Sequence, residues 1–156
     1  MKKFKVYVDT SVFGGVFDDR FSDASLKFFD LVRTRYLSLV TSVVVRDEIQ
    51  PAPEQVREYF ASITADAEVA DINQEALSLR NAYLDARIVT EKSSDDALHV
   101  ALATVTDCKL IVSWNFKHIV NFEKIPLYNA VNALNGFSNI AIFSPMEVVK
   151  NEDNDN

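Results

Sequence analysis

The sequence predicts an α/β domain with a mostly parallel central sheet and helices on both of its faces. The chain has 156 residues, which is the length of one domain. Short apolar runs alternate with amphipathic segments at helical spacing, and this alternation is typical of a parallel sheet. Hydrophobic residues make up 48% and charged residues 25%, which is ordinary globular composition and counts against disorder.

Two strands are predicted in the first half of the chain. Residues 4–9 are β-rich and mostly apolar, as expected of a strand that is covered on both faces, and 37–42 form a second short strand. Apolar residues at helical spacing, together with two prolines that stop one helix and open the next, predict helices between and after them. These helices cover 24–36, 43–50 and 53–63.

The second half begins with 67–72, which we read either as a strand or as a connection. The segment 93–107 is nearly all apolar after its first turn, which predicts a helix buried on most sides. Gly136 is the expected C-terminal stop of another helix. The remaining predicted elements are helices at 74–88 and 121–136 and strands at 109–114 and 138–145.

The charge balance carries information about both function and domain bounds. Lys and Arg number 16 and Asp and Glu number 23, so the net charge is −7, which counts against a general phosphate-backbone binder. Several of the acids lie in the terminal run NEDNDN. We therefore predict a single domain over 1–148 and an acidic, disordered tail over 149–156.

The rarer residues exclude several kinds of site. Three glycines, in this spacing, rule out a GxGxxG dinucleotide loop, and one cysteine with two histidines cannot form a four-ligand zinc site. The lone Cys108 suits a reducing compartment. No apolar run is long enough for a signal peptide or a membrane span, so we expect a soluble cytoplasmic protein without a membrane partner.

Polar side chains gather where the predicted strands end. Asp9 ends the first strand, and Asn115 follows the strand KLIVSW. Glu48 lies in the helix after the second strand, while Asp95 and Asp96 open the buried helix. Because ligands bind beyond the carboxyl ends of strands in open α/β sheets, Asp9, Glu48 and Asp96 are expected to converge at one edge.

A cluster of carboxylates predicts a hard cation. Like charges raise one another's pKa values, and a divalent cation relieves this repulsion. Oxygen ligands suit Mg²⁺ or Mn²⁺, which can activate water and hold a phosphoryl group for in-line displacement. Part of the net negative charge would then lie inside a site and be masked by metal.

Each of these residues also has a purely structural interpretation. Asp9 is equally suited to cap a helix, and Asp96 could form a capping box with Ser93. Glu48, taken alone, reads better as part of a solvated helix face. His99 is expected to be a hydrogen-bonded core or rim histidine rather than a base. Three further residues are expected to be structural. Trp114 is expected to be packed, His118 to lie at the surface or cap locally, and Cys108 to be buried and inert.

Four segments, in this order, resemble the PIN-domain nucleases and, among them, the VapC-like toxins of toxin–antitoxin pairs. They are VYVDTSVFGG at 7–16, TSVVVRDEI at 41–49, DDALHVALA at 95–103 and LIVSWNFKHI at 110–119. Each motif is common by itself, but together they span nearly the whole chain. The resemblance implies a three-layer α/β/α fold and a Mg²⁺- or Mn²⁺-dependent endoribonuclease.

The resemblance also assigns site residues. It places three acidic metal ligands on Asp9, Glu48 and Asp96, and a fourth, usually acidic, position on Asn115. Because an amide carries no charge, the asparagine favours one metal ion over two. Supporting roles toward metal-bound water, substrate or the ligands themselves would fall on Thr10, Ser11, Asp95, Ser113 and Lys117.

The implied partners are an RNA substrate, single-stranded or looped, and a cognate antitoxin; a homodimer stays open. Lys117 and Lys92 are candidates for holding RNA at the rim of the site. The alternative function is a catalytically inactive PIN-like module that binds RNA or protein, which Asn115 and the acidic balance favour. A receiver or phosphatase domain on the same architecture is less well supported, because Trp-Asn rather than Lys follows the strand KLIVS.

Overall fold

The computed structural model describes residues 4–34 and 37–154. Five parallel strands form one sheet in the order β3-β2-β1-β4-β5. The strands are β1 (Phe4–Val8), β2 (Leu37–Ser42), β3 (Glu68–Ala70), β4 (Leu110–Val112) and β5 (Ala141–Phe143). The ambiguous segment 67–72 is thus a strand, and the predicted sheet is parallel throughout the part of the chain that is described.

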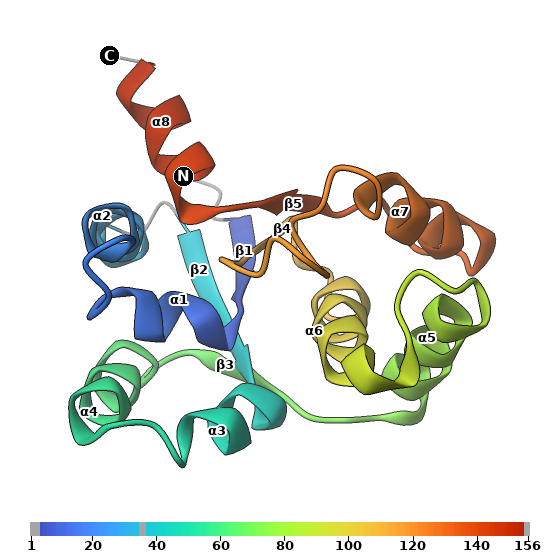
Figure 1. The fold of residues 1–156 in the computed structure, drawn as a ribbon, viewed down its shortest axis with the longest axis horizontal. Coiled ribbons are helices and arrows are strands. Elements are labelled where there is room, and N and C mark those ends of the chain that lie inside the picture. The colour runs from blue at the N-terminus through green and yellow to red at the C-terminus, as the bar shows by residue number, and fades with distance from the viewer. Residues whose placement is uncertain (1–3, 35–36, 155–156) are drawn as a thin grey trace.

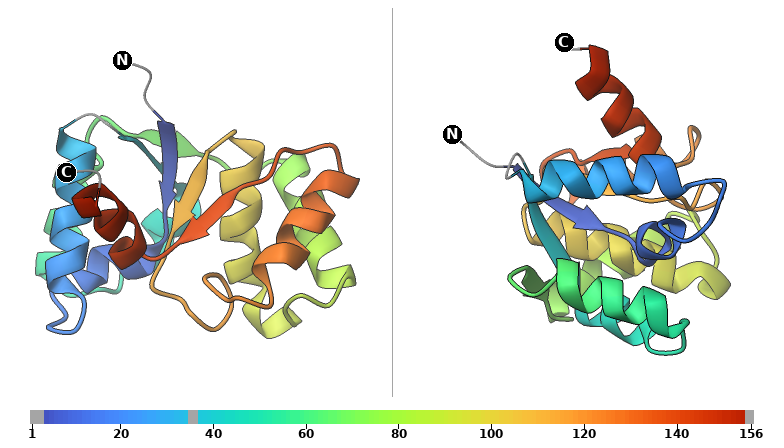
Figure 2. Two further views of the ribbon diagram at one scale, coloured as in Figure 1. Left: turned by 90° about the horizontal axis from the view of Figure 1, so that it is seen from above. Right: turned by 90° about the vertical axis from the view of Figure 1, so that its left-hand side faces the viewer.

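Helices cover both faces of the sheet. On one side lie α1 (Thr10–Gly15), α2 (Ser22–Arg33), α3 (Val43–Ile49) and α4 (Glu54–Ile63) (Figure 1). On the other side lie α5 (Gln74–Asp85), α6 (Ser94–Val105) and α7 (Ile125–Leu134), with a short 3-10 turn at Glu91–Ser93 before α6. A last helix, α8 (Pro145–Asn154), follows β5 and packs against α2 (Figure 2).

The predicted helices and strands are present, with shifted bounds. The helix expected at 24–36 begins earlier, at Ser22, and ends at Arg33, while residues 35–36 lie outside the described chain. Ser42 and Asn73 begin α3 and α5, because each side chain accepts a hydrogen bond from a backbone N–H one turn into its helix, at 3.1 and 2.8 Å. The strands expected at 109–114 and 138–145 are shorter, at three residues each.

The C-terminal segment differs from the prediction. The acidic tail expected from residue 149 is helical through Asn154, and residues 155–156 lie outside the described chain. The reason is a capping box: the Ser144 N–H donates to Glu147 Oε1 at 3.0 Å, and the Glu147 N–H donates to Ser144 Oγ at 3.3 Å. Val149 is buried, which ties the helix to the body of the protein.

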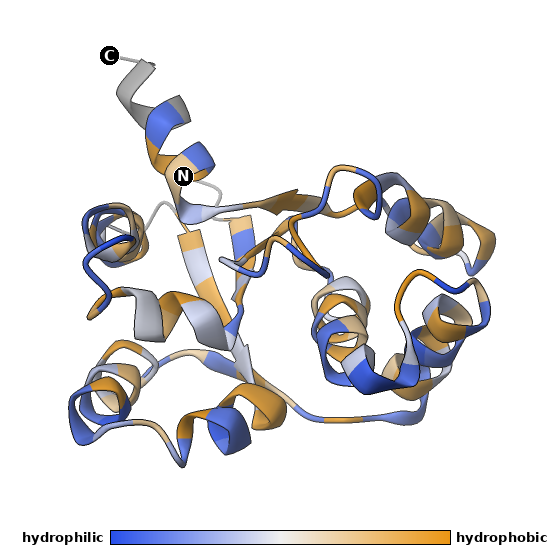
Figure 3. Cartoon of the chain, viewed as in Figure 1, coloured by the Kyte–Doolittle hydropathy of each residue, from blue (hydrophilic) through white to orange (hydrophobic). Residues whose placement is uncertain are grey.

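One hydrophobic core joins the layers. Most helices carry both hydrophobic and hydrophilic residues, as expected when one side of a helix is buried (Figure 3). The helix α6 is buried from Ala97 to Thr104, as the apolar run predicted. None of the helices in the described ranges is long and apolar enough to span a membrane. The largest fully buried side chains include Tyr7, Tyr83, Tyr128, Phe13, Phe28 and Phe29.

Candidate active site

The candidate site lies at the carboxyl ends of the central strands. Asp9 directly follows β1, and Ser113 directly follows β4. The two strands are joined at this end, because the Asp9 N–H donates to the Val112 carbonyl at 3.0 Å. The strands β2 and β3 extend the sheet on one side of β1, and the later strands β4 and β5 extend it on the other. The site therefore lies where the strand order reverses, which is where open α/β sheets bind ligands.

The Asp9 carboxylate is buried and faces hydroxyl groups. Its Oδ2 accepts hydrogen bonds from Ser11 Oγ and Ser113 Oγ, both at 2.8 Å. Asp9 stands at the N-cap position of α1, yet its side chain accepts no capping hydrogen bond from a backbone N–H of that helix. The helix-capping interpretation of Asp9 is therefore wrong, and the two serines fix the carboxylate against the ends of β1 and β4.

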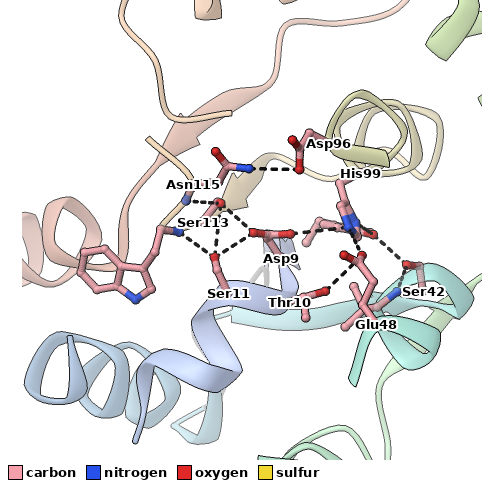
Figure 4. A network of polar contacts seen from close by, with 12 residues as sticks. Asp9, Thr10, Ser11, Ser42, Glu48, Asp96, His99, Ser113 and Asn115 are labelled. Atoms are coloured by element: carbon pink, nitrogen blue, oxygen red, sulfur yellow. Dashed lines mark hydrogen bonds and ion pairs between the residues drawn. The ribbon is translucent and has the colours of Figure 1, made fainter. Parts of the chain in front are cut away.

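Glu48 reaches the site from α3. Its side chain is about two-fifths exposed, but its Oε1 accepts hydrogen bonds from Thr10 Oγ1 at 3.3 Å and from His99 Nε2. The same nitrogen of His99 lies 3.6 Å from Asp9 Oδ1. The imidazole thus stands between the two carboxylates, and Glu48 is more than a residue of a solvated helix face (Figure 4).

His99 is held from its other side by a tyrosine. Its ring is buried, and its Nδ1 lies 2.7 Å from the Tyr7 hydroxyl, which in turn lies 2.7 Å from Ser42 Oγ. Ser42 is also the N-cap of α3, the helix that carries Glu48. The network therefore closes on itself and links β1, α3 and α6. His99 is hydrogen-bonded in the core, as expected, but it is also part of the site.

Burial and neighbouring charges shift the pKa values of His99 and Asp96. Burial lowers the pKa of His99, but the hydrogen bond with Glu48 and the charges of Asp9, Glu48 and Asp96 outweigh it and raise the pKa above its ordinary value. Burial and the negative charge of Asp9 raise the pKa of Asp96. The raised pKa favours protonation of His99, whose imidazolium would balance part of the negative charge of Asp9 and Glu48, while burial and Asp9 disfavour the charged form of Asp96.

Asn115 holds Asp96. Its Nδ2 donates to Asp96 Oδ1 at 3.0 Å, while its Oδ1 accepts from the backbone N–H groups of Lys117 and His118 at 3.2 and 3.0 Å. Because the two backbone donors require an oxygen, the amide nitrogen must face Asp96. The side chain thus points at the cluster with its donor end, not with the oxygen that could ligate a metal.

The remaining sequence candidates divide into two groups. Thr10, Ser11 and Ser113 bond the carboxylates themselves, whereas Asp95, Lys92 and Lys117 are exposed and, among the described hydrogen bonds and ion pairs, contact no residue of the cluster through their side chains. The capping box of Ser93 and Asp96 is not formed. Ser93 Oγ instead lies 3.2 Å from Nε2 of His118.

The structural interpretations of Trp114 and Cys108 are confirmed. Trp114 is buried, and its Nε1 donates to Ser25 Oγ at 2.9 Å. Cys108 is also buried, and burial raises the pKa of its thiol to about 11, which keeps it protonated.

Sequence reasoning missed the site roles of His99, Tyr7 and Ser42. His99 lies three residues after Asp96, so the helical period already placed both on one face of α6. Tyr7 and Ser42 gave no such signal, because their contacts join residues 92 and 35 positions apart in the chain.

Comparison with known proteins supports the architecture. No protein-family model matches the chain, and no curated protein matches its sequence. Among solved structures, the chain is similar to a chain of VapBC2 from Rickettsia felis, crystallised with a DNA fragment from their promoter. The TM-score is 0.62 at 15% identity, over 90% of this chain and 98% of that chain. The fold is PIN-like. The predicted α/β class with helices on both faces of a parallel sheet is confirmed.

The donor chemistry of the site suits a divalent cation, although no preformed cage is present. The side chains of Asp9, Glu48 and Asp96 point toward one another (Figure 4). Within the described ranges, no group of three or more His, Cys, Asp or Glu residues is arranged to hold a metal ion. Mg²⁺ usually binds through one or two carboxylates, water and substrate phosphate, which requires no such group. Asp9 and Asp96 fit that mode, while Glu48 is engaged by His99.

Proposed function

We propose that the chain is a divalent-metal-dependent endoribonuclease and the toxin of a toxin–antitoxin pair. The observation that supports this most strongly is the convergence of Asp9, Glu48 and Asp96 at the carboxyl ends of the strands in a PIN-like sheet. Burial and the charge of Asp9 raise the pKa of Asp96. Acids in this state are expected where a cation or a reacting group will neutralise them.

In this proposal Asp9 and Asp96 hold Mg²⁺ or Mn²⁺. The bound cation would lower the pKa of a water molecule and stabilise negative charge on the phosphate. Ser11 and Ser113 fix the orientation of Asp9, and Asn115 fixes that of Asp96. Such supporting contacts preorganise a metal site.

Glu48 has a separate role in the proposal. Held by Thr10 and His99, it lies beside the two aspartates as a third acid that can ligate the metal directly or accept a hydrogen bond from its water. Protonation of His99, which its raised pKa favours, would keep the repulsion between Asp9 and Glu48 low until a cation is bound.

The test is cleavage of single-stranded RNA by purified protein with EDTA, Mg²⁺ or Mn²⁺. We expect cleavage that requires metal and that is lost in Asp9→Asn prepared in parallel, since this change removes one ligand charge. Equal cleavage by the two proteins would point to a contaminating ribonuclease and contradict the assignment.

The proposal extends to a partner and a location. The similar solved structure is a VapBC2 complex bound to promoter DNA, which supports a cognate antitoxin for this chain. We propose that the toxin acts on RNA in the cytoplasm. Expression of the chain alone should arrest growth, and co-expression of a small neighbouring reading frame should restore it.

A second function is favoured by two observations. Because His99 already pairs with Glu48, and Asn115 replaces a fourth acid, the site could serve an inactive PIN-like module that binds RNA or protein. Metal-dependent cleavage separates the two functions. Growth arrest that is equal in the parent and in Asp9→Asn would favour the binding module.

A further inference from the structure

A row of contacting side chains leads from Arg20, through two rings, to Phe116 beside the site loop after β4. The Arg20 guanidinium lies 4.9 Å from the centre of the Phe21 ring, and Phe21 stacks on Trp114 with ring centres 4.2 Å apart. Trp114 in turn meets Phe116 at 6.0 Å and 64°. We call these four residues the aromatic row.

The outer member of the row is open to solvent. Trp114 is only 7% exposed, whereas Phe116 is 51% exposed. Phe116 packs on the buried Trp114 with one part of its ring and leaves the rest open to contact, and covering this apolar surface would be favourable. The row thus presents a firmly supported aromatic ring at the surface.

The row is anchored to the carboxylate cluster. The backbone N–H of Trp114 donates to Ser11 Oγ at 2.9 Å, and Ser11 Oγ donates to Asp9. Asn115, between the two aromatic residues, holds Asp96 with its nitrogen and the backbone of residues 117–118 with its oxygen. Phe116 therefore directly follows Asn115, the residue that orients Asp96, which is one of the proposed metal ligands.

Charge beside Phe116 favours a nucleic acid. Lys117, the next residue, is exposed, and no described hydrogen bond or ion pair engages its ammonium group. A ring with a neighbouring lysine matches the alternation of base and phosphate along a single strand, where bases stack on aromatic side chains. A protein interface would instead be expected to have a broader apolar centre.

We propose that Phe116 is a stacking platform for one base of single-stranded RNA next to the scissile phosphate, with Lys117 contacting a neighbouring phosphate. This inference rests on the proposed nuclease function and adds to it a substrate-binding residue. Because every base has a π face, the platform would bind with little preference for sequence. Specificity would then have to come from elsewhere on the protein.

The inference can be tested by binding in EDTA, where metal-dependent cleavage is blocked. Trp114 is the only tryptophan in the chain, so its fluorescence reports on the row. We titrate a short single-stranded oligoribonucleotide into the parent, Phe116→Ala and Phe116→Tyr. Binding should change Trp114 emission in the parent. Loss of stacking should weaken affinity about ten-fold in Phe116→Ala, and Phe116→Tyr should stay within about two-fold.

A matched control and a modified RNA separate stacking from general effects. Leu134→Ala removes another exposed apolar side chain, 85% exposed and at the far end of α7, and should leave RNA affinity unchanged. An oligoribonucleotide with abasic positions should bind the parent and Phe116→Ala with equal, weak affinity. In cleavage assays, Phe116→Ala should raise KM with little change in kcat.

The outcomes distinguish this inference from the proposed function. Equal RNA affinity of the parent and Phe116→Ala would overturn the platform and leave the nuclease proposal standing. An unchanged RNA affinity together with lost binding of a protein partner would assign the ring to a protein interface instead. If the parent neither binds nor cleaves RNA, the RNA substrate fails and the platform fails with it.

Discussion

Asn115 donates to Asp96 and accepts from two backbone N–H groups, so both ends of its side chain are used. In Asn115→Asp the donor becomes a carboxylate oxygen that faces Asp96. Loss of this charge-assisted hydrogen bond should lower the free energy of unfolding of the metal-free protein by about 1.5–3 kcal/mol at neutral pH. Added Mn²⁺ should recover the loss, because four acids bind a cation more tightly than three.

The measurement is thermal unfolding of parent and variant across a Mn²⁺ titration. Asn139→Asp adds the same charge before β5, at the opposite end of the sheet, and the unfolding temperature of this control should change with Mn²⁺ as that of the parent does. Metal-induced shifts that are identical in all three proteins would show that Asn115 does not lie beside a metal site.

His99 predicts a pH dependence of stability. Its pKa is raised in the folded protein, so folding favours the protonated ring. This contribution is complete below the unfolded pKa of about 6.5 and is lost as pH rises through the folded value. His99→Gln lacks this titrating group, so the extra stability of the parent over the variant should be largest near pH 6 and should shrink toward pH 9. Urea denaturation at each pH would measure the two free energies of unfolding. A difference that stays constant with pH would contradict the counter-ion role.

Residue spacing in the sequence predicted which acids converge, but not which side chains they contact. Asp9, Glu48 and Asp96 could be placed at one edge because strand ends and helix starts are local features. The orientation of Asn115 and the insertion of His99 depend on partners from distant segments. The bond between Ser113 and Asp9 spans 104 residues, and no periodicity records it.

At the scale of elements, α1 approaches α2 and the aromatic row at Gly15. A Cβ there would lie 2.8 Å from both Ser25 Oγ and Trp114 Nε1, two atoms that are hydrogen-bonded to each other. Gly15→Ala should therefore destabilise the protein by about 1–3 kcal/mol, as overpacking does.

Gly14 provides the matched control, since a Cβ there meets no atom within 4 Å. Gly14→Ala should be neutral or stabilise the protein by up to about 1 kcal/mol, because alanine favours a helix. Urea unfolding followed by Trp114 fluorescence would compare the two variants. Similar effects of both would mean that α1 does not pack closely on Trp114.

The helix α8 shows how an element was missed. The run NEDNDN has the composition of a disordered tail, and composition decided the prediction. The local signal was nevertheless present in Ser144-Pro-Met-Glu147, which is a capping box with proline at the first helical position. Packing of Val149 in the body, which stabilises the helix, could not be foreseen from composition.

At the scale of the whole molecule, the parallel sheet explains why the site forms where it does. Parallel strands present their carboxyl ends at one edge, so loops after β1, β2 and β4 must meet there. The alternation of apolar runs and helices was enough to predict this class of fold. The order of the strands was not predicted, because pairing depends on packing between segments far apart in the chain.

Part of the net charge of −7 lies in the candidate site. Three of the acids converge on one site, where His99 offsets part of their charge, so the negative balance is compatible with an RNA substrate that binds through Phe116 and Lys117 as well as through metal. Cleavage should then depend on Asp96 and not on acidic charge in general.

The central claim is tested most directly by comparing two neighbouring residues. Asp95 and Asp96 both lie in the first turn of α6, but among the described hydrogen bonds only Asp96 contacts Asn115. Burial and the charge of Asp9 raise the pKa of Asp96. We expect Asp96→Asn to lower the rate of Mn²⁺-dependent RNA cleavage by more than about 100-fold, since even groups that merely support a metal ligand contribute about 10–100-fold. Asp95→Asn, with the same loss of charge, should keep the parent rate. Equal rates in Asp96→Asn and Asp95→Asn would contradict the site.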